Sequence, residues 1–445
     1  MEAPLDGYIA FMLVATALVL MMTVPALALF YGGMTRSKST LNMMMMSFVA
    51  FAIVAIIFPL WGWSEGGWFG TNPGAGNGKL IANPFNLFGL HLESADQYVF
   101  VLFQMTFAAI TAALISGAIA DRIKIASWAI FVVFWVTLVY FPIAHNVWGG
   151  GWFYTKFPNL DYAGGTVVHI NAGIAGLVLA IITGKRIGFK KDPMKPHNVT
   201  LTMIGAGLLW FGWYGFNVGS VVTGVATDDG SNASWLNGQY AKEMPWTFMT
   251  TTVATATACI LWLITERIVH GKFTSLGAAS GIVAGLVAIT PSCGAVNFVG
   301  SIVVGGVAGI VCSLAVGLKY KFGYDDSLDV VGVHLVGGIL GALLIGFVGT
   351  AKHSPQGLDN FFPAGGDGIF YGGNATLLGH QAAGVLFTLV WSGVITAILG
   401  LIIKYTIGWR VKPEAEVEGI DINEHGETAY ELGSSLSSHL VTEGV

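Results

Sequence analysis

Long apolar runs, separated by short polar stretches, make up most of the chain between Ile9 and Lys404. A helix needs about 20 apolar residues to cross a hydrocarbon core of roughly 30 Å, and the runs have about that length. The pattern predicts eleven transmembrane helices, at Ile9 to Phe30, Leu41 to Trp63, Tyr98 to Ala120, Ile125 to Ile143, Gly164 to Thr183, Asn198 to Val218, Pro245 to Thr265, Thr274 to Thr290, Phe298 to Leu318, Leu328 to Val348 and Ala382 to Lys404. An odd number of helices places the two termini on opposite faces of the membrane.

The composition agrees with this pattern. Of the 445 residues, 54% are hydrophobic and only 10% are charged, and the mean hydropathy is +0.70. Too little charged surface remains for an ordinary soluble globular protein, so the predicted fold class is an all-α polytopic membrane protein. Cys259, Cys293 and Cys312 lack metal-ligand spacing, so we predict no metal and no cofactor. We also expect no nucleic-acid partner.

Basic residues cluster in alternate loops, and this asymmetry orients the chain. One predicted face carries 16 of the 20 lysine and arginine residues, namely Arg36, Lys38, Arg122, Lys124, Lys185, Arg186, Lys190, Lys191, Lys195, Arg267, Lys272, Lys319, Lys321, Lys404, Arg410 and Lys412. The positive-inside rule therefore places the N-terminus outside and the C-terminus in the cytoplasm. We predict a transmembrane domain at residues 1–410 and a cytoplasmic regulatory tail at residues 411–445, in a plasma or inner cell membrane.

One spacing occurs twice: an aspartate is followed eight residues later by a histidine inside an apolar run. The first copy holds Asp161, His169, Gly173 and Gly176, and the second holds Asp326, His334, Gly338 and Gly341. On the predicted topology the two runs cross the membrane in opposite directions. The pattern therefore predicts an inverted five-helix repeat plus a final helix, with the two imidazoles meeting near the midplane at a shared site.

Histidine in a membrane helix is by default a functional hypothesis, although a packing role is the ordinary alternative for a single one. Two neutral imidazoles can accept and return a proton, but they cannot replace the hydration shell of a metal cation. A protonated amine suits such a pore, because burial penalises its charged form and it can cross as a neutral molecule. Phe107, Trp148 and Phe216 stand where an aromatic cation site is needed, although each alone is typical of an interfacial belt.

At these residues the chain resembles the ammonium transporter family, the Amt and Mep proteins related to the Rh proteins. The resemblance rests on "ALALFYGGMTRSKS", "DYAGGTVVHINAGIAGL", "GFNVGS", "DVVGVHLVGGILG" and "EGIDINEHGETAY", and it covers about Ala10 to Tyr430. It implies eleven helices around a narrow pore in each subunit of a homotrimer. It also implies a transporter rather than an enzyme, with ammonium and methylammonium as substrates.

The resemblance also assigns site residues. By motif, ammonium binding falls to Phe107, Trp148 and Ser220, the gate to Phe107 and Phe216, the pore lining to His169, His334 and Trp213, and support of the vestibule to Asp161. Asp326 is the repeat partner of Asp161, whereas Asp329 lies nearer His334 in the chain. The sequence leaves both Asp326 and Asp329 as candidates for the functionally important acid at the cytoplasmic end.

The tail motif in Glu418 to Tyr430 fits regulation by a PII-type signalling protein at the cytoplasmic face, as in prokaryotic relatives. We expect this segment to pack against cytoplasmic loops of its own and a neighbouring subunit, where Lys185, Arg186 and Lys190 are available. The exposed ion pairs involved are weak, so several contacts together must hold it.

The leading interpretation is a permease that recruits ammonium, deprotonates it, passes ammonia along the histidines and returns the proton separately. One alternative is an electroneutral ammonia channel of Rh type. A second is an ammonium sensor that signals through its tail; we see no kinase, cyclase or other output domain after Tyr430, which weighs against it. An intramembrane hydrolase is the least favoured, because no Ser or Cys nucleophile motif lies beside either histidine.

Overall fold

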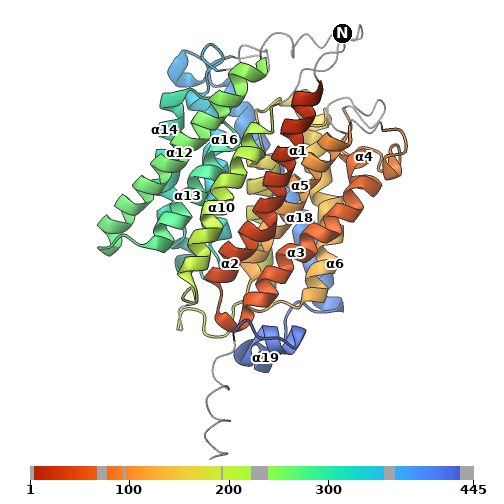
Figure 1. Cartoon of the computed structure of the whole chain (residues 1–445), viewed down its shortest axis with the longest axis vertical. Helices are drawn as coiled ribbons and strands as arrows, with labels where there is room; N and C mark the ends of the chain where they lie inside the picture. Colours follow the sequence, from red (N-terminus) through yellow and green to blue (C-terminus); the bar gives the residue numbers. More distant parts are fainter. Residues whose placement is uncertain are drawn as a thin grey trace, which may run out of the picture.

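The regular structure of the chain is helical throughout the part described by the computed structural model, which is residues 5–67, 78–93, 97–191, 194–221, 239–354 and 366–430. Ten helical stretches there have the length and apolar composition needed to cross a membrane, and the apolar helix Ser275–Ile289 is shorter. Figure 1 shows the long helices standing side by side, with the N-terminus at one end of the bundle and α19 (Pro413–Glu418) at the other. The chain is a multi-pass membrane protein of the predicted class.

Each of the first five passages is built from two or three helical segments. They are α1 (Leu5–Met21), η1 (Met22–Leu27) and α2 (Ala28–Met34); α3 (Thr40–Ile57), η3 (Phe58–Gly62) and α4 (Trp63–Gly66); α5 (Tyr98–Ile115) and η6 (Ser116–Ile119); α6 (Ile125–Trp135), η7 (Val136–Tyr140) and α7 (Phe141–Val147); and η8 (Gly165–Ile170) and α9 (Asn171–Thr183). Pro25 and Pro59 fall in wide turns, because proline removes a hydrogen bond of the helix.

The remaining passages follow in chain order. They are α10 (Val199–Val218), α12 (Gln239–His270), α13 (Ser275–Ile289), α14 (Phe298–Ala315) with α15 (Leu318–Phe322), η9 (Val331–Leu335) with α16 (Val336–Val348), and α18 (Thr376–Thr406). These segments coincide with the predicted apolar runs, but α12 and α18 each begin six residues before the run does. Helical structure continues past the apolar stretch there, because polar residues can complete helical turns outside the hydrocarbon.

The passages that carry the two histidines pack against each other reciprocally. A Cβ atom on Gly173 would lie 2.5 Å from the backbone nitrogen of Leu335, and one on Gly338 would lie 3.0 Å from Cγ1 of Ile170. In each case the glycine four residues after one histidine meets the residue directly after the other. Only glycine allows this approach, so the paired glycines bring the two histidine segments together.

The loop before each histidine is hydrogen-bonded to the other half of the chain. The bonds are Tyr162 N to Pro291 O (3.1 Å), Ala163 N to Thr290 O (3.2 Å), Ser327 N to Ala118 O (3.3 Å) and Leu328 N to Gly117 O (3.1 Å). The first two join the fifth passage to the end of the eighth, and the last two join the tenth to the end of the third. This exchange of equivalent contacts agrees with the predicted inverted repeat.

The tail folds back onto loops at the end of the bundle opposite the N-terminus. Backbone hydrogen bonds join Val411 N to Arg122 O (3.2 Å) and Lys124 N to Trp409 O (2.9 Å). The buried carboxylate of Asp421 accepts hydrogen bonds from the backbone of Leu41 (3.0 Å) and Asn42 (2.8 Å), at the start of α3. The expected packing against loops is therefore present within the subunit.

The basic residues that hold the tail differ from those expected. Arg36 Nη2 donates to Glu416 O at 3.3 Å, Lys38 donates to the carbonyl of Val417, and Arg410 forms an ion pair with Glu416. Arg186 instead pairs with Asp325 at 3.0 Å. The side-chain contacts thus come from the loop before α3 and from Arg410, whereas the expected loop contributes backbone groups: Ile187 N donates to Glu416 Oε1 at 2.6 Å, and Lys185 O accepts from Arg410 at 2.7 Å.

Candidate functional site

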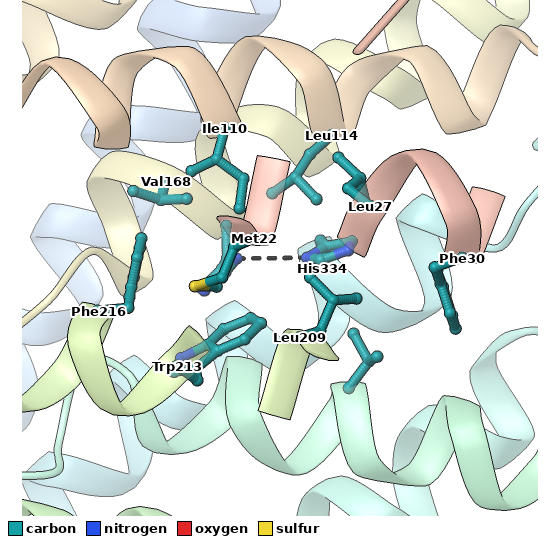
Figure 2. Close-up of a pocket in the computed structure, with 12 residues that line it drawn as sticks. Met22, Leu27, Phe30, Ile110, Leu114, Val168, Leu209, Trp213, Phe216 and His334 are labelled. Carbon is teal, nitrogen blue, oxygen red and sulfur yellow. Dashed lines mark hydrogen bonds between the residues drawn. The ribbon is translucent and has the colours of Figure 1, made fainter. Parts of the chain in front are cut away.

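Three cavities lie along the bundle. The first two meet at the contact between Phe107 and Phe216, and the second and third share Phe30, Val283 and His334. The first, which we call the vestibule, has a volume of about 710 Å³ and is lined in part by Phe107, Trp148 and Ser220. The second, the central cavity, has about 320 Å³ and is lined by Phe216, Trp213 and both repeat histidines (Figure 2). The third, the inner cavity, has about 260 Å³ and shares His334 with the second. All eight predicted site residues thus border this line of cavities.

Two stacked phenylalanine rings separate the vestibule from the central cavity. Phe107 comes from α5 and Phe216 from the last turn of α10, and their ring centroids are 4.0 Å apart at an interplanar angle of 9°. Both side chains are buried. Trp148 meets Phe107 edge to face at 6.2 Å. A solute passing between the two cavities must displace or tilt this pair.

The polar groups of the vestibule are oriented by hydrogen bonds. The hydroxyl of Ser220 donates to the carbonyl oxygen of Phe216 at 2.8 Å, which leaves the serine oxygen available as an acceptor. The indole nitrogen of Trp148 donates to the carbonyl oxygen of Asp161 at 2.7 Å, and this bond helps to fix the ring that faces the vestibule. An acceptor beside aromatic faces is an arrangement that suits a small organic cation.

Asp161 organises the start of the first histidine segment. Its buried carboxylate accepts backbone hydrogen bonds from Gly164 (2.9 Å), Thr166 (2.9 Å) and Val167 (3.1 Å), and the hydroxyl of Thr166 also donates to it. Burial raises the pKa of this carboxyl above its ordinary value, and the hydrogen bonds from Thr166 and the backbone oppose that rise. The carboxylate therefore anchors the backbone at the start of η8, beside the wall of the vestibule.

The two histidines meet in the central cavity. Nδ1 of His334 lies 3.3 Å from Nδ1 of His169, and the ring centroids are 5.4 Å apart. One Nδ1 must donate and the other accept, so the pair shares a proton between two neutral rings. Among the described residues Nε2 of His169 has no hydrogen-bond partner. The pair therefore keeps one polar atom available in a cavity that is otherwise mostly apolar.

Trp213 completes the wall beside the first histidine. Its ring stacks on His169 with centroids 5.4 Å apart, and its indole nitrogen donates to Thr290 Oγ1 at 2.8 Å. The remaining wall includes Leu114 and Leu209, as Figure 2 shows. A charged solute in this cavity would lose most of its hydration, and few polar groups are present to replace it.

Comparison with known proteins identifies the family. The profile of the Ammonium Transporter Family matches residues 10–430. An ammonium transporter of Mycobacterium tuberculosis is 49% identical over 467 residues, covering 99% of this chain and 93% of that protein. The chain belongs to the ammonium transporter family. An ammonium transporter of Aquifex aeolicus is 45% identical, covering 97% of this chain and 95% of its own.

Solved structures agree with this assignment. Saccharomyces cerevisiae Mep2 matches with a TM-score of 0.77 and 33% identity, covering 92% of this chain and 88% of its own. A protein described as a sensor Amt protein matches with a TM-score of 0.80 and 27% identity, covering 95% of this chain and 98% of its own. The relatives are named as ammonium transporters, which are transporters rather than enzymes, and the described part of this family member has ten helical stretches long and apolar enough to cross a membrane.

The two candidate inner acids of this ammonium transporter family member occupy different positions. Asp326 accepts hydrogen bonds from the backbone of Val330 (3.1 Å) and Val331 (2.8 Å), as Asp161 does at the start of η8. Asp329 forms an ion pair with Lys319 at 2.6 Å and lines the inner cavity. Asp326 is therefore the structural counterpart of Asp161, and Asp329 is the acid that borders the inner cavity.

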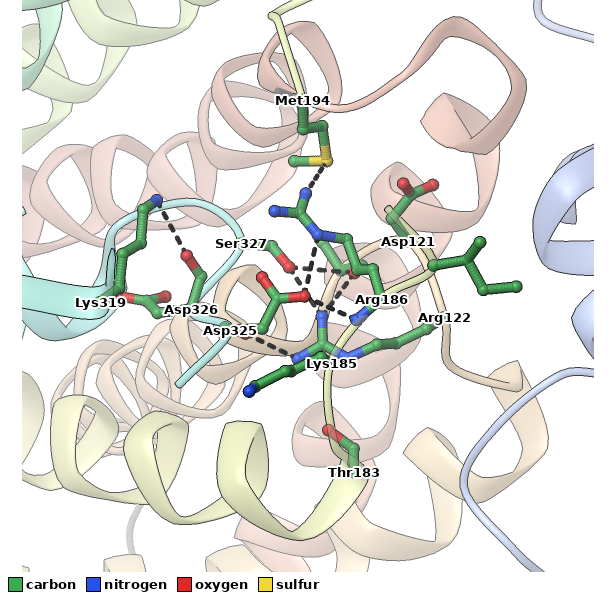
Figure 3. Close-up of polar contacts among 12 residues, drawn as sticks. Asp121, Arg122, Thr183, Lys185, Arg186, Met194, Lys319, Asp325, Asp326 and Ser327 are labelled. Carbon is green, nitrogen blue, oxygen red and sulfur yellow. Dashed lines mark hydrogen bonds and ion pairs between the residues drawn. The ribbon is translucent and has the colours of Figure 1, made fainter. Parts of the chain in front are cut away.

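A buried charge network surrounds the loop that carries Asp326 (Figure 3). Arg122 donates to Ser327 Oγ at 2.7 Å and to the carbonyl oxygen of Asp325 at 2.8 Å. Lys319 Nζ donates to the carbonyl oxygen of Asp326 at 3.0 Å. Burial raises the pKa of Asp326, and the Lys319 ammonium opposes that rise. These contacts brace the loop that leads into the second histidine segment.

Two polar residues of the vestibule were not predicted as site residues. Gln104 and Asn159 line it, and Oε1 of Gln104 and both side-chain polar atoms of Asn159 have no hydrogen-bond partner among the described residues. A glutamine inside an apolar run was a signal that could have found Gln104. Asn159 lies in a loop, where an asparagine is ordinary, so the sequence offered no such signal for it.

Proposed function

We propose that the protein is an ammonium permease that binds ammonium in the vestibule, deprotonates it at the phenylalanine pair, and conducts ammonia through the central cavity. The observation that carries this proposal is the order of the groups. An acceptor and aromatic faces come first, a stacked gate comes second, and two hydrogen-bonded imidazoles come third in an apolar cavity. The first group suits bound ammonium, the second the point of deprotonation, and the third the passage of neutral ammonia.

Recruitment would rely on Trp148, Phe107 and Ser220. A cation over the faces of these rings gains about 0.5 to 2 kcal/mol through the ring quadrupole. The oxygen of Ser220 would accept a hydrogen bond from the ammonium, because its own proton is directed to Phe216 O. Asp161 would support the site by holding Trp148 and the loop in place. Methylammonium has the same charge and three N–H donors, so it would bind at the same site.

Selectivity would follow from proton loss. Burial penalises the charged amine as it penalises a buried lysine, whose pKa falls by up to 3 to 5 units from about 10.4. Ammonia needs no hydration shell of the strength that a cation needs, so it can cross a narrow apolar cavity. Potassium has no proton to lose, and the imidazoles cannot replace its water shell. The shared proton of His169 and His334 would let the pair accept a proton and pass it on separately.

The assembly and orientation are part of the same proposal. We infer a homotrimer with one pore in each subunit, in a plasma or inner cell membrane, with the N-terminus outside and the C-terminus in the cytoplasm. The concentration of basic residues on one face supports this orientation. Residues 1–410 would form the transport domain, and residues 411–445 a regulatory tail, of which 431–445 lie outside the described residues. A PII-type signalling protein would act at this face.

The test is a joint recording of current and internal pH on purified protein in liposomes after an ammonium jump. The proposal expects a saturable current with ammonium and none with potassium at the same concentration. Flux of ammonia with a pH change but no current would favour the electroneutral Rh-type channel instead. No flux at all would favour the sensor interpretation, and a protein described as a sensor Amt protein is among the structures that this chain resembles.

A further inference from the structure

A second acidic side chain lies behind the wall of the vestibule. Glu243 is on α12, one residue inside the outer limit of the apolar stretch Lys242–His270, and its side chain is only 2% exposed. Its Oε1 accepts a hydrogen bond from the hydroxyl of Tyr162 at 2.7 Å. Ionisable residues are rare in membrane helices and usually mark a functional site, so a buried glutamate at this place requires an explanation.

Tyr162 connects this carboxylate to the vestibule. It follows Asp161 directly in the chain and lines the cavity. Its backbone nitrogen is held by Pro291 O at 3.1 Å, and its hydroxyl receives a hydrogen bond from Thr247 Oγ1 at 3.3 Å while donating to Glu243. Both hydrogen-bonding capacities of the phenol are therefore used away from the cavity. Tyr162 therefore borders the vestibule and contacts the carboxylate through its hydroxyl.

We propose that Glu243 is a positioning residue that strengthens cation binding in the vestibule through its negative charge, acting from behind Tyr162 and in addition to Asp161. This inference rests on the proposed function, because it concerns the affinity of the same vestibule for ammonium. For a carboxylate placed roughly 8 to 10 Å from a bound cation, at an effective dielectric constant of about 20 to 40, Coulomb's law gives a change in affinity of about fourfold to thirtyfold. A purely structural glutamate would only hold the tyrosine hydroxyl.

The test separates these roles with Glu243→Gln, because glutamine can still accept the hydrogen bond of Tyr162 but carries no charge. Full-length wild-type and variant proteins are reconstituted in liposomes, and initial rates are measured against ammonium concentration. We expect KM to rise about fourfold to thirtyfold with kcat within twofold of wild type. Glu243→Asp keeps the charge and should restore KM to within about threefold of wild type.

A matched control is available on the same helix. Glu266→Gln removes a carboxylate near the opposite end of α12, where Glu266 accepts hydrogen bonds from Thr274. We expect this variant to leave KM for ammonium unchanged. Thr247→Glu in the Glu243→Gln background returns a carboxylate one helical turn away on the same face, and it should lower KM again.

Two results would overturn the inference. One is an unchanged KM in Glu243→Gln, and the other is a loss of kcat at constant KM, which would indicate a proton-relay or structural role. If Glu243→Gln does not accumulate in the membrane, comparison of Glu243→Asn with Glu243→Asp carries the same test, because both shorter side chains can accept a hydrogen bond and only the aspartate is charged. Failure of the proposed function itself would appear earlier, as the absence of ammonium transport by the wild-type protein.

Discussion

Removing both repeat histidines tests whether the central cavity excludes ions by being dry. His169 and His334 are almost completely buried on the wall of this narrow cavity. Replacing each ring by the methyl group of alanine frees about 60 Å³, and the two together make room for roughly four water molecules at about 30 Å³ each. The variant also loses the hydrogen bond between the rings, worth about 0.5 to 1.5 kcal/mol, which the fold should tolerate.

We expect the double variant His169→Ala/His334→Ala to conduct potassium as well as ammonium. A hydrated cavity no longer requires a cation to lose either its proton or its water shell. The assay is current recorded on reconstituted protein in ammonium and then in potassium at equal concentration. Wild type should pass no measurable potassium current, whereas in the variant the two currents should agree within about tenfold, since a wetted pore of this kind discriminates weakly.

His380→Ala is the matched control, because His380 belongs to the membrane helix α18 and lines none of the three cavities. It should keep potassium exclusion intact. Ammonium transport at the wild-type rate with potassium still excluded in the double variant would refute the reasoning, since selectivity would then not depend on the imidazoles. A variant with no current for either ion, at normal membrane abundance, would show that the pair is needed for conduction but would contradict the hydration argument.

Three further outcomes are expected. Truncation after Lys412, and Asp421→Ala alone, should lower transport at equal membrane abundance, because Asp421 caps the start of α3 at about 1 kcal/mol; equal rates would make the tail a passive appendage. A reporter after Val445 should be cytoplasmic and a cysteine at Asn232, outside the described residues, should label from outside, whereas labelling only after permeabilisation would reverse the topology. Asp161→Ala should reduce transport more than Asp161→Asn, because the amide oxygen of asparagine still accepts some of the backbone hydrogen bonds. Ammonium transport rates of the two variants check this, and equal rates would contradict it.

The sequence alone determined the class of protein, the positions of the membrane passages and the pairing of the histidines. Apolar length is a local property, and each membrane helix satisfies its own backbone, so hydropathy along the chain is enough to locate the passages. The repeated aspartate-to-histidine spacing identified His169 and His334 because a repeat leaves the same pattern in both halves. Phe107, Trp148 and Phe216 were candidates from the sequence, but their division into a binding site and a gate came only through the family resemblance, since single aromatic residues near a membrane surface are common.

Tertiary structure alone decided which residues far apart in the chain become neighbours. Asp326 and Asp329 were equivalent candidates until the backbone contacts of Asp326 distinguished the anchor from the acid in the inner cavity. Glu243 contacts Tyr162 across 81 positions of sequence, in a helix with no motif of its own. Such contacts depend on how the helices pack and on which face each helix turns towards its neighbours. Lipid tails are as apolar as the side chains, so the apolar pattern of the sequence does not determine which faces meet.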